Sequence, residues 1–458
     1  MLRPTPRRAS RAAVLAAAAA AAGLSLAALA AVPTASAADP EPFVVVGTSD
    51  VFDSYLAQKV LEPGFEAAYP QYDFQYVSKG TGAAIAYAQA GTADAMIVHA
   101  ASLENQFVDQ GYSLEQYGRA IFWGDYVLLG PASDPAGVLT GAPHDIATAF
   151  EKVAAAGAAG TANFVSRGGT PGTTVQEHAI WALTSGVTTC DVSAANGGGT
   201  SPSTTTGACP SSISYPSWYH ATGLTQGPNI LNASTCNYPG GNCYVLTDRG
   251  TFNYLQSTGQ ATNLQIVTRD NDDTARGGQA VLVNSFHAYG INPAKFSDSP
   301  NVDINTAAAT AFLNWVTSPD VQKEIGSYLA DQGAPFLPSA APTITGEPSA
   351  TKVATGKKVK LSGSLTNVVP GTPALAGVTV RIFRVLPGTG LPAPKLVGKA
   401  VTGAKGRFSL TLKPTKTAYY IASTQAISQI EDASLDPVFG DLLAPASARI
   451  GKVKVTRR

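Results

Sequence analysis

The sequence lacks the short motifs of several enzyme and metal-site classes. It contains no GxSxG elbow and no HExxH pair, so neither an α/β-hydrolase nucleophile turn nor a helical zinc-protease site is indicated. Its 4 cysteines include no CxxC pair, and His220 is the only histidine between Cys190 and Cys243. A zinc site at these cysteines is therefore the less favoured alternative, and we expect no metal or cofactor. No segment after residue 37 reaches membrane-spanning length.

The N-terminal segment predicts export. Four arginines precede an apolar run from Ala12 to Val32, and Ala35-Ser36-Ala37 forms a small-x-small cleavage pattern. We expect a signal peptide over residues 1–37, cleaved after Ala37, and a secreted protein that is extracellular or associated with the cell envelope. A retained membrane anchor is the alternative, but an alanine-dominated run suits export better. No cysteine follows the run, so lipid attachment at a mature N-terminal Cys is not expected.

The net charge of zero conceals three unlike parts. Residues 1–37 carry four Arg and no acid, residues 38–340 carry 10 Lys+Arg and 26 Asp+Glu, and residues 341–458 carry 17 Lys+Arg and 5 Asp+Glu. Such asymmetry predicts different partners for the acidic and basic parts. We expect the basic part to bind an anionic cell-envelope polymer, with a solubilising spacer as the alternative. We expect no nucleic-acid partner and a monomer.

Residues 38–338 read as an α/β domain. Apolar strands such as Phe43–Val46 end in polar turns, and helical spacing follows, as over Val51–Phe65. Repeated strand-turn-helix units of this kind predict a largely parallel sheet. A polar insert, residues 187–243, carries all the cysteines. Residues 339–350 read as a proline-rich linker, and the period-two pattern of residues 351–458 predicts a small all-β sandwich.

The cysteines predict two local disulfides if the chain is exported. They are Cys190, Cys209, Cys236 and Cys243, and all lie within the polar insert. Of the three possible connectivities we favour the sequential one, Cys190 with Cys209 and Cys236 with Cys243.

Three turns at strand ends are rich in hydroxyl groups. The first contains Thr48 and Ser49, the second Thr81, and the third runs from Ser166 to Thr174. The third turn contains Arg167, Thr170, Gly172 and Thr173 and no carboxylate. Free N–H groups of the following helices, hydroxyls and one guanidinium are the donors that an oxyanion needs. Ordinary helix capping with an incidental arginine is the alternative.

Several motifs together resemble one family. They are Gly47-Thr48-Ser49, Val98-His99, Asp125-Tyr126, Phe164-Val165-Ser166-Arg167-Gly168, Trp218-Tyr219, Gln226-Gly227 and Leu246-Thr247-Asp248-Arg249-Gly250-Thr251. With them, residues 40 to about 338 resemble the extracytoplasmic tungstate-binding proteins of ABC importers, relatives of the phosphate-binding proteins. The resemblance implies a two-lobed type II periplasmic-binding-protein fold that holds an anion between its lobes and delivers it to a permease.

The chain departs from the family pattern in two places. Gly47 and Asp50 stand where hydroxyls are usual in the first turn, and Gly169-Thr170-Pro171 follows the Arg-Gly pair where the family has an acidic residue. The basic part resembles bacterial immunoglobulin-like modules through Gly406-Arg407-Phe408 and Tyr419-Tyr420-Ile421.

The chemistry of the turns assigns roles. We expect Arg167 to bind the anion directly, with Thr48, Ser49, Thr81, Thr170, Gly172 and Thr173 and nearby backbone N–H groups completing the donor shell. His99 ends a buried strand and is a further candidate, with a structural histidine as its alternative. Arg249 and Gln226 are expected to act indirectly. Because tungstate and molybdate are unprotonated at neutral pH, a site of donors alone favours them over hydrogen phosphate.

Two other classes of function remain as alternatives. A secreted hydrolase would need Ser49 or Ser166 as nucleophile and His99 or His178 as base. An adhesion protein with a vestigial ligand cleft is the other. Because the chain contains neither GxSxG nor HExxH and its turns are rich in hydrogen-bond donors, the expected function is non-enzymatic capture of a tetrahedral oxyanion.

Overall fold

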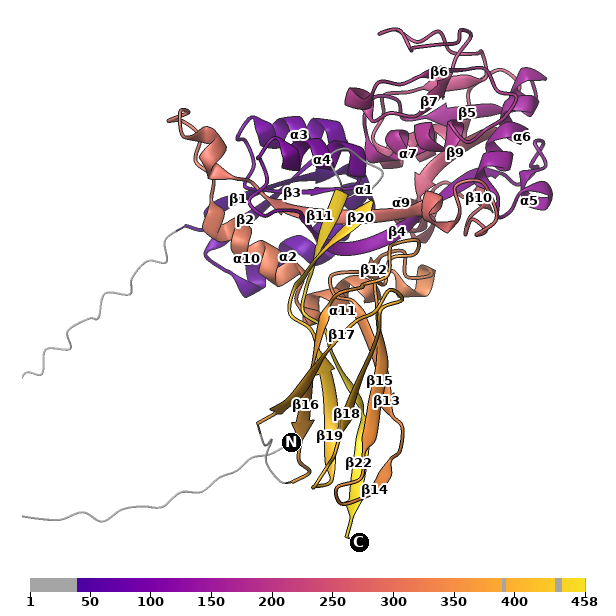
Figure 1. The fold of residues 1–458 in the computed structure, drawn as a ribbon. Helices are drawn as coiled ribbons and strands as arrows, with labels where there is room; N and C mark the ends of the chain where they lie inside the picture. The colour runs from indigo at the N-terminus through magenta and orange to yellow at the C-terminus, as the bar shows by residue number, and fades with distance from the viewer. Residues whose placement is uncertain (1–38, 389–392, 433–438, 458) are drawn as a thin grey trace, which may run out of the picture. The chain divides into compact units, whose positions relative to one another are not determined.

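The computed structural model describes residues 39–388, 393–432 and 439–457, so the expected signal peptide lies outside the described residues. Residues 41–338 form a mixed α/β structure, and strands dominate from residue 343 onward. Figure 1 shows the α/β part as two groups of strands and helices that the long strand β4 (Gly118–Pro131) enters in turn. Within the described chain, no helix has the length and apolar character needed to cross a membrane.

The first of these two groups, which we call lobe 1, is a mostly parallel sheet with helices on both faces. The second group is lobe 2. Strands β1 (Glu41–Thr48), β2 (Tyr72–Lys79) and β3 (Ala95–Val98) are parallel in the order β2-β1-β3, and β11 (Val283–Gly290) joins antiparallel to β3. One core around Phe43, Phe65 and Phe312 fills one face of the sheet. The helical elements are α1 (Ser49–Asp53), η1 (Ala57–Leu61), α2 (Glu62–Ala68), α3 (Thr81–Gln89), α4 (Ala101–Asp109), α10 (Thr306–Val316) and α11 (Pro319–Ser327).

The helix expected over Val51–Phe65 is interrupted. It ends at Asp53, Tyr55 adopts a left-handed φ of 62°, and a π-helical turn leads into α2. The exposed Tyr55 ring stacks on Tyr254 of lobe 2, with ring centroids 4.3 Å apart. A contact between lobes therefore overrides the local periodicity, which sequence spacing could not reveal.

Lobe 2 continues the same sheet through β4. The first half of β4 pairs with β11, and its second half pairs with β9 (Cys243–Asp248) and β10 (Leu264–Thr268). Strands β5 (Asn163–Ser166) and β8 (Tyr219–Ala221) lie beyond β9, all three mutually parallel. The helical elements of this lobe are α5 (Val138–Gly141), α6 (Ile146–Ala158), α7 (Gly172–Trp181), α8 (Gln226–Thr235), α9 (Arg249–Ser257) and η3 (Gln279–Leu282).

Both predicted disulfides are present. Cys190 on β6 (Thr189–Asp191), which pairs with β7 (Thr200–Pro202), bonds Cys209, and Cys236 bonds Cys243. The insert is more ordered than a surface loop, because it contains these strands, β8 and α8.

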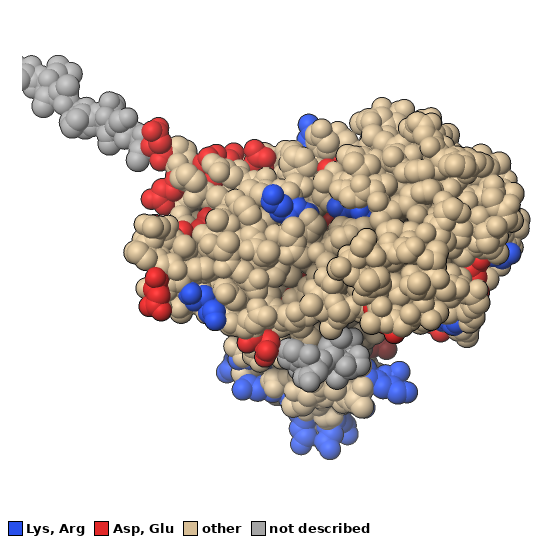
Figure 2. Space-filling model, turned by 90° about the horizontal axis from the view of Figure 1, so that it is seen from above, with Lys and Arg blue, Asp and Glu red and all other residues tan. Residues whose placement is uncertain are grey.

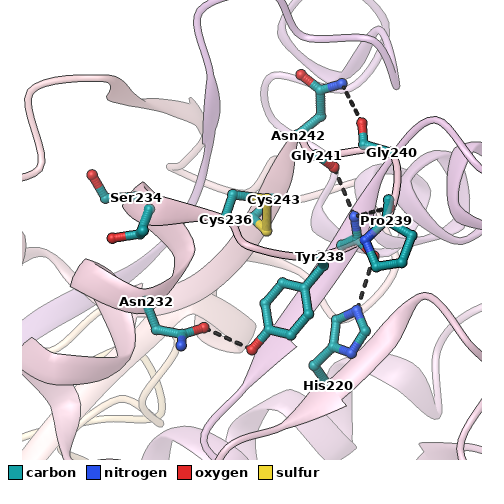
Figure 3. Close-up of a disulfide and its surroundings, with 12 residues drawn as sticks. His220, Asn232, Ser234, Cys236, Tyr238, Pro239, Gly240, Gly241, Asn242 and Cys243 are labelled. Carbon is teal, nitrogen blue, oxygen red and sulfur yellow. Dashed lines mark hydrogen bonds between the residues drawn. A yellow bond between two sulfur atoms is a disulfide. The ribbon is translucent and has the colours of Figure 1, made fainter.

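The second bridge stabilises the start of β5 (Figure 3). The ring of Tyr238, between the two cysteines, stacks on His220 with centroids 3.7 Å apart. Asn163 Oδ1 accepts from His220 Nε2 (2.8 Å), and Asn163 Nδ2 donates to the Gly241 carbonyl (2.7 Å). Because Asn163 begins the strand that ends at Ser166, this network fixes the strand that positions Arg167.

Eight strands of the C-terminal part, β13 to β19 and β22, form two sheets. Sheet β13-β15-β18 has three strands, and sheet β14-β22-β19-β16-β17 has five. Their bounds are β13 (Thr343–Pro348), β14 (Lys352–Ala354), β15 (Val359–Thr366), β16 (Thr379–Val385), β17 (Lys395–Val401), β18 (Arg407–Leu412), β19 (Ala418–Ser423) and β22 (Ser447–Thr456). Residues 343–348 of the expected linker are thus strand β13, and β12 (Leu337–Pro338) pairs with β4.

One hairpin of the C-terminal part joins the α/β sheet. Strands β20 (Ile427–Asp432) and β21 (Phe439–Leu443) pair with each other, and β21 pairs with β4 at Gly118 and Arg119. Buried His287 of β11 lies 2.8 Å from Asp441 of β21 and 2.9 Å from Glu104 of α4. Burial opposes a charge on His287, but both carboxylates raise its pKa well above the ordinary value. The C-terminal part is therefore anchored to lobe 1 by a buried charge cluster.

Candidate functional site

Six strand-to-helix turns converge where the lobes meet. In lobe 1 the turns follow β1, β2 and β3, and in lobe 2 they follow β5, β8 and β9. Direct contacts join them: Gly227 N–H donates to Asp53 (2.7 Å), and Gly82 N–H donates to the Thr170 carbonyl (3.0 Å). A Cβ on Gly172 would lie 2.3 Å from the His99 carbonyl oxygen. The carboxyl ends of strands in α/β sheets are the usual place for ligands, and here both lobes present theirs to each other.

Arg167 lies at the centre of this junction. Its side chain is buried, and its Nη2 donates to Ser49 Oγ across the lobes (2.8 Å). Its Nη1 donates to Gln226 Oε1 (2.8 Å), and its Nε donates to the Leu224 carbonyl (3.2 Å). Gly168 and Gly169 follow with φ of 67° and 66°, a conformation that favours glycine and turns the chain into α7. The guanidinium thus points into the site rather than to a surface acid.

Two buried threonines bring hydroxyl groups to this junction. Thr48, the N-cap residue of α1, is 1% exposed, and Thr81, the first residue of α3, is 0% exposed. Among the described residues, Thr81 Oγ1 has no hydrogen-bond partner, and the Thr48 hydroxyl faces Asp50, whose pKa it lowers. Because buried hydroxyls are normally paired, the Thr81 hydroxyl is placed to donate to a group between the lobes.

Asp50 is the main feature that the expectation of a donor-only site missed. Its carboxylate is fully buried and lies 2.7 Å from His99 Nε2, and His99 Nδ1 lies 2.8 Å from the Tyr126 hydroxyl. Burial would raise the pKa of Asp50, but His99, Thr48 and Arg167 together hold it below its ordinary value. The site therefore contains an acceptor as well as donors.

One further residue, Gln226, holds Arg167 and Thr173 in place. Gln226 Oε1 also accepts from Thr173 Oγ1 (3.0 Å), and Gln226 Nε2 donates to Thr247 Oγ1 (2.7 Å). Gln226 therefore orients three other side chains. Arg249 instead pairs with Asp125 (2.6 Å) at the middle of β4, away from Arg167.

The sequence analysis also missed two buried carboxyl groups near the site, those of Asp248 and Glu177. Buried Asp248 caps α9 by accepting from the Thr251 N–H (2.7 Å), and burial together with Asp50 raises its pKa. Glu177 of α7 is buried and accepts from the Tyr219 hydroxyl and Trp181 Nε1. A carboxylate immediately after Ser49 was the available signal for Asp50, and the Asp125-Tyr126 motif marked Tyr126 without indicating its contact with His99, whereas Glu177 carries no signal.

The serine and histidine candidates for a hydrolase are not paired. Ser49 Oγ accepts from Arg167, and both His99 nitrogens face Tyr126 and Asp50. His178 Nδ1 has no hydrogen-bond partner among the residues that the structure describes. Among the residues for which the structure gives positions, no group of three or more His, Cys, Asp or Glu side chains could hold a metal ion.

Comparison with known proteins agrees with this geometry. Residues 17–320 match the model of the PBP superfamily domain. The chain belongs to the PBP superfamily. A putative ABC transporter anion-binding protein of Haloferax volcanii is 32% identical over 300 residues, which are 64% of this chain and 70% of that protein. The tungstate-binding protein TupA of Peptoclostridium acidaminophilum is 28% identical over 295 residues, 64% of this chain and 82% of that protein.

The chain is also similar to a solved structure. The tungstate-binding protein TupA from Desulfovibrio alaskensis G20 shares 28% identity, with coverage of 65% of this chain and 98% of that one and a TM-score of 0.45. The match to the family model, over residues 17–320, covers the α/β part of the chain almost to its end.

Proposed function

We propose that this chain is the extracytoplasmic solute-binding component of an ABC importer and captures a tetrahedral oxyanion between its lobes. The observation that carries the proposal is the buried guanidinium of Arg167, which donates across the lobes to Ser49 Oγ (2.8 Å), the residue that follows Thr48. The buried Thr81 hydroxyl, which has no partner among the described residues, is a second donor at the same junction. The first turns of α1, α3 and α7 add backbone N–H groups. The hydroxyl of Ser49, the backbone N–H of Thr173 and those of the turn from Gly168 to Gly172 complete the proposed donor set.

Tungstate and molybdate are the first candidates, because the relatives are named for tungstate and the donors outnumber the acceptors. Asp50 makes this choice testable. If His99 neutralises the charge of Asp50, the site accommodates a fully deprotonated dianion. If the Asp50 carboxylate is instead free to accept a hydrogen bond, hydrogen phosphate can donate its proton to it. The same binding series therefore reports both the function and the anion.

Calorimetry of the full mature chain with tungstate, molybdate, phosphate and sulfate tests the proposal. We expect one anion to bind at 1:1 stoichiometry and Arg167→Gln to weaken it about 100-fold, the scale of a lost charge-assisted bidentate contact. The matched control is Arg276→Gln, which removes a surface guanidinium paired with Glu151 in the same lobe. No binding of any of the four anions, or equal weakening in both variants, contradicts the proposal.

We also propose that the basic C-terminal part, an immunoglobulin-like module, holds the protein at an anionic cell envelope. Its 17 Lys+Arg against 5 Asp+Glu support this attachment. Salt washing of cells that produce the protein with and without residues 341–458 tests it. Identical release of both forms contradicts it.

A further inference from the structure

The five-stranded sheet of the C-terminal part has one buried face and one outer face. Val380, Ile382, Tyr420 and Val453 point into the core, in accordance with period-two alternation. The residues that alternate with these four along each strand lie on the outer face. The four residues belong to β16, β19 and β22, which run side by side in the C-terminal part (Figure 1).

The centre of this outer face is apolar. Phe383 of β16 pairs with Ile421 of β19 on one side and with Leu396 of β17 on the other. Val385 pairs with Tyr419. Leu396 is 43% exposed, and the others are half-buried. The solvent-facing side of a sandwich sheet normally carries polar residues, so a strip of aromatic and aliphatic side chains here requires a reason.

Cations border this strip. Arg449 pairs in register with Ile421, and its guanidinium carbon lies 3.6 Å from the centre of the Tyr419 ring. Lys452 lies 5.0 Å from the same ring, and Arg381 pairs with Lys399 across β16 and β17. The sequences of β14, β16, β17, β19 and β22 contain no Asp or Glu. The outer face is therefore uniformly positive around an aromatic centre.

We propose that this outer face binds an anionic glycan, a polysaccharide whose sugar rings lie on Tyr419 and Phe383 while its acidic groups contact the bordering cations. The proposal rests on the proposed extracytoplasmic location, where such polymers occur, and gives the envelope attachment a defined surface. A second copy of the chain is an unsuitable occupant, because two such faces would bring like charges together. Charge alone would not call for the apolar strip, whereas sugar rings have flat C–H faces that aromatic rings cover.

The test measures binding of the full mature chain to polygalacturonate, a uronic-acid polymer, at low salt. We expect Arg449→Gln/Lys452→Gln and Phe383→Ser each to weaken binding by about tenfold or more. The matched control, Lys405→Gln/Arg407→Gln, removes two exposed cations from outside this sheet and is expected to keep the wild-type affinity. Circular dichroism and oxyanion binding in the cleft are measured on every variant, and both are expected to stay unchanged.

Three results overturn the proposal. One is no binding of polygalacturonate by the wild type. Another is an equal loss of polygalacturonate affinity in the control variant Lys405→Gln/Arg407→Gln, because binding would then depend only on net charge. The third is equal or tighter binding of polyglutamate, single-stranded DNA or anionic lipid vesicles, since these lack a polysaccharide. Because cleft binding is measured separately, failure here is distinguishable from failure of oxyanion capture.

Discussion

The most quantitative prediction concerns Glu177 on α7, the helix that follows the Arg167 turn. Its carboxylate is 1% exposed and accepts from the Tyr219 hydroxyl (2.5 Å) and from Trp181 Nε1 (3.1 Å). Burial outweighs these hydrogen bonds and raises the pKa of Glu177 from 4.5 to about 7. Between these values the native protein holds a proton that the unfolded chain has released.

The sign and size of the effect follow from linkage. A carboxyl group whose pKa is higher in the native state contributes stability that is fully present below pH 4.5 and is lost as the pH rises through 7. At about 1.4 kcal/mol per pH unit over this interval, the loss is about 3 kcal/mol. Glu177→Gln has nearly the same shape and cannot ionise, so it removes this loss.

Urea unfolding of the ligand-free protein tests the prediction. Fluorescence of Trp181 and Trp218, both in lobe 2, reports the transition at pH 4.5 and pH 8. We expect Glu177→Gln to match the wild type near pH 4.5 and to exceed it by about 3 kcal/mol at pH 8. The control is Glu324→Gln, the same chemical change at an exposed position. If the Glu177→Gln and wild-type stabilities differ by the same amount at both pH values, Glu177 is not the buried titrating group.

Two further predictions concern lobe closure and the insert. Gly172→Ala places a methyl group against the backbone and ring of His99. Because this clash exists only when the lobes are closed, the variant should bind the oxyanion at least about tenfold more weakly, and the melting temperature of the ligand-free protein should not fall. An unchanged affinity in calorimetry would show that the lobes do not close through this contact. Cys190→Ser/Cys209→Ser opens a loop with a sequence separation of 19 and should cost about 3 kcal/mol of stability, measured by thermal unfolding; an unchanged melting temperature would show that the insert unfolds independently of lobe 2.

Local chemistry predicted much of the α/β part. The apolar run Phe43–Val46 is inside β1, and the sequential disulfides are present. These features depend on neighbours in sequence or on short loops. By contrast, the composition of the segment Ala280–Asn284 predicts a strand, but η3 occupies its first half and β11 begins only at Val283. A short apolar run does not distinguish a buried strand from a buried helical turn.

Features that depend on distant parts of the chain were not predictable. Nothing near Asp441 indicates that it faces His287 from another part of the sequence, or that the hairpin β20-β21 extends the sheet of lobe 1. Likewise, Asp50 was visible as a departure from the family pattern, but its 2.7 Å contact with His99 requires the β1 and β3 ends to be neighbours. Sequence spacing therefore located the turns, and the sheet topology decided which side chains meet.

The charge distribution separates selection of an anion from location of the protein. The α/β part is acidic overall, and the face in Figure 2 is mostly uncharged, with acidic and basic side chains both scattered over it. Such a surface does not attract anions over long distances. Exposed charges are screened beyond about 8 Å at physiological salt, whereas Arg167 and the hydroxyls of Thr48 and Thr81 are buried and act by direct contact. Anion capture should therefore depend weakly on salt, and any attachment through the exposed cations of the C-terminal part should depend on it strongly. Affinity measured across a salt series separates the two sites without any mutation.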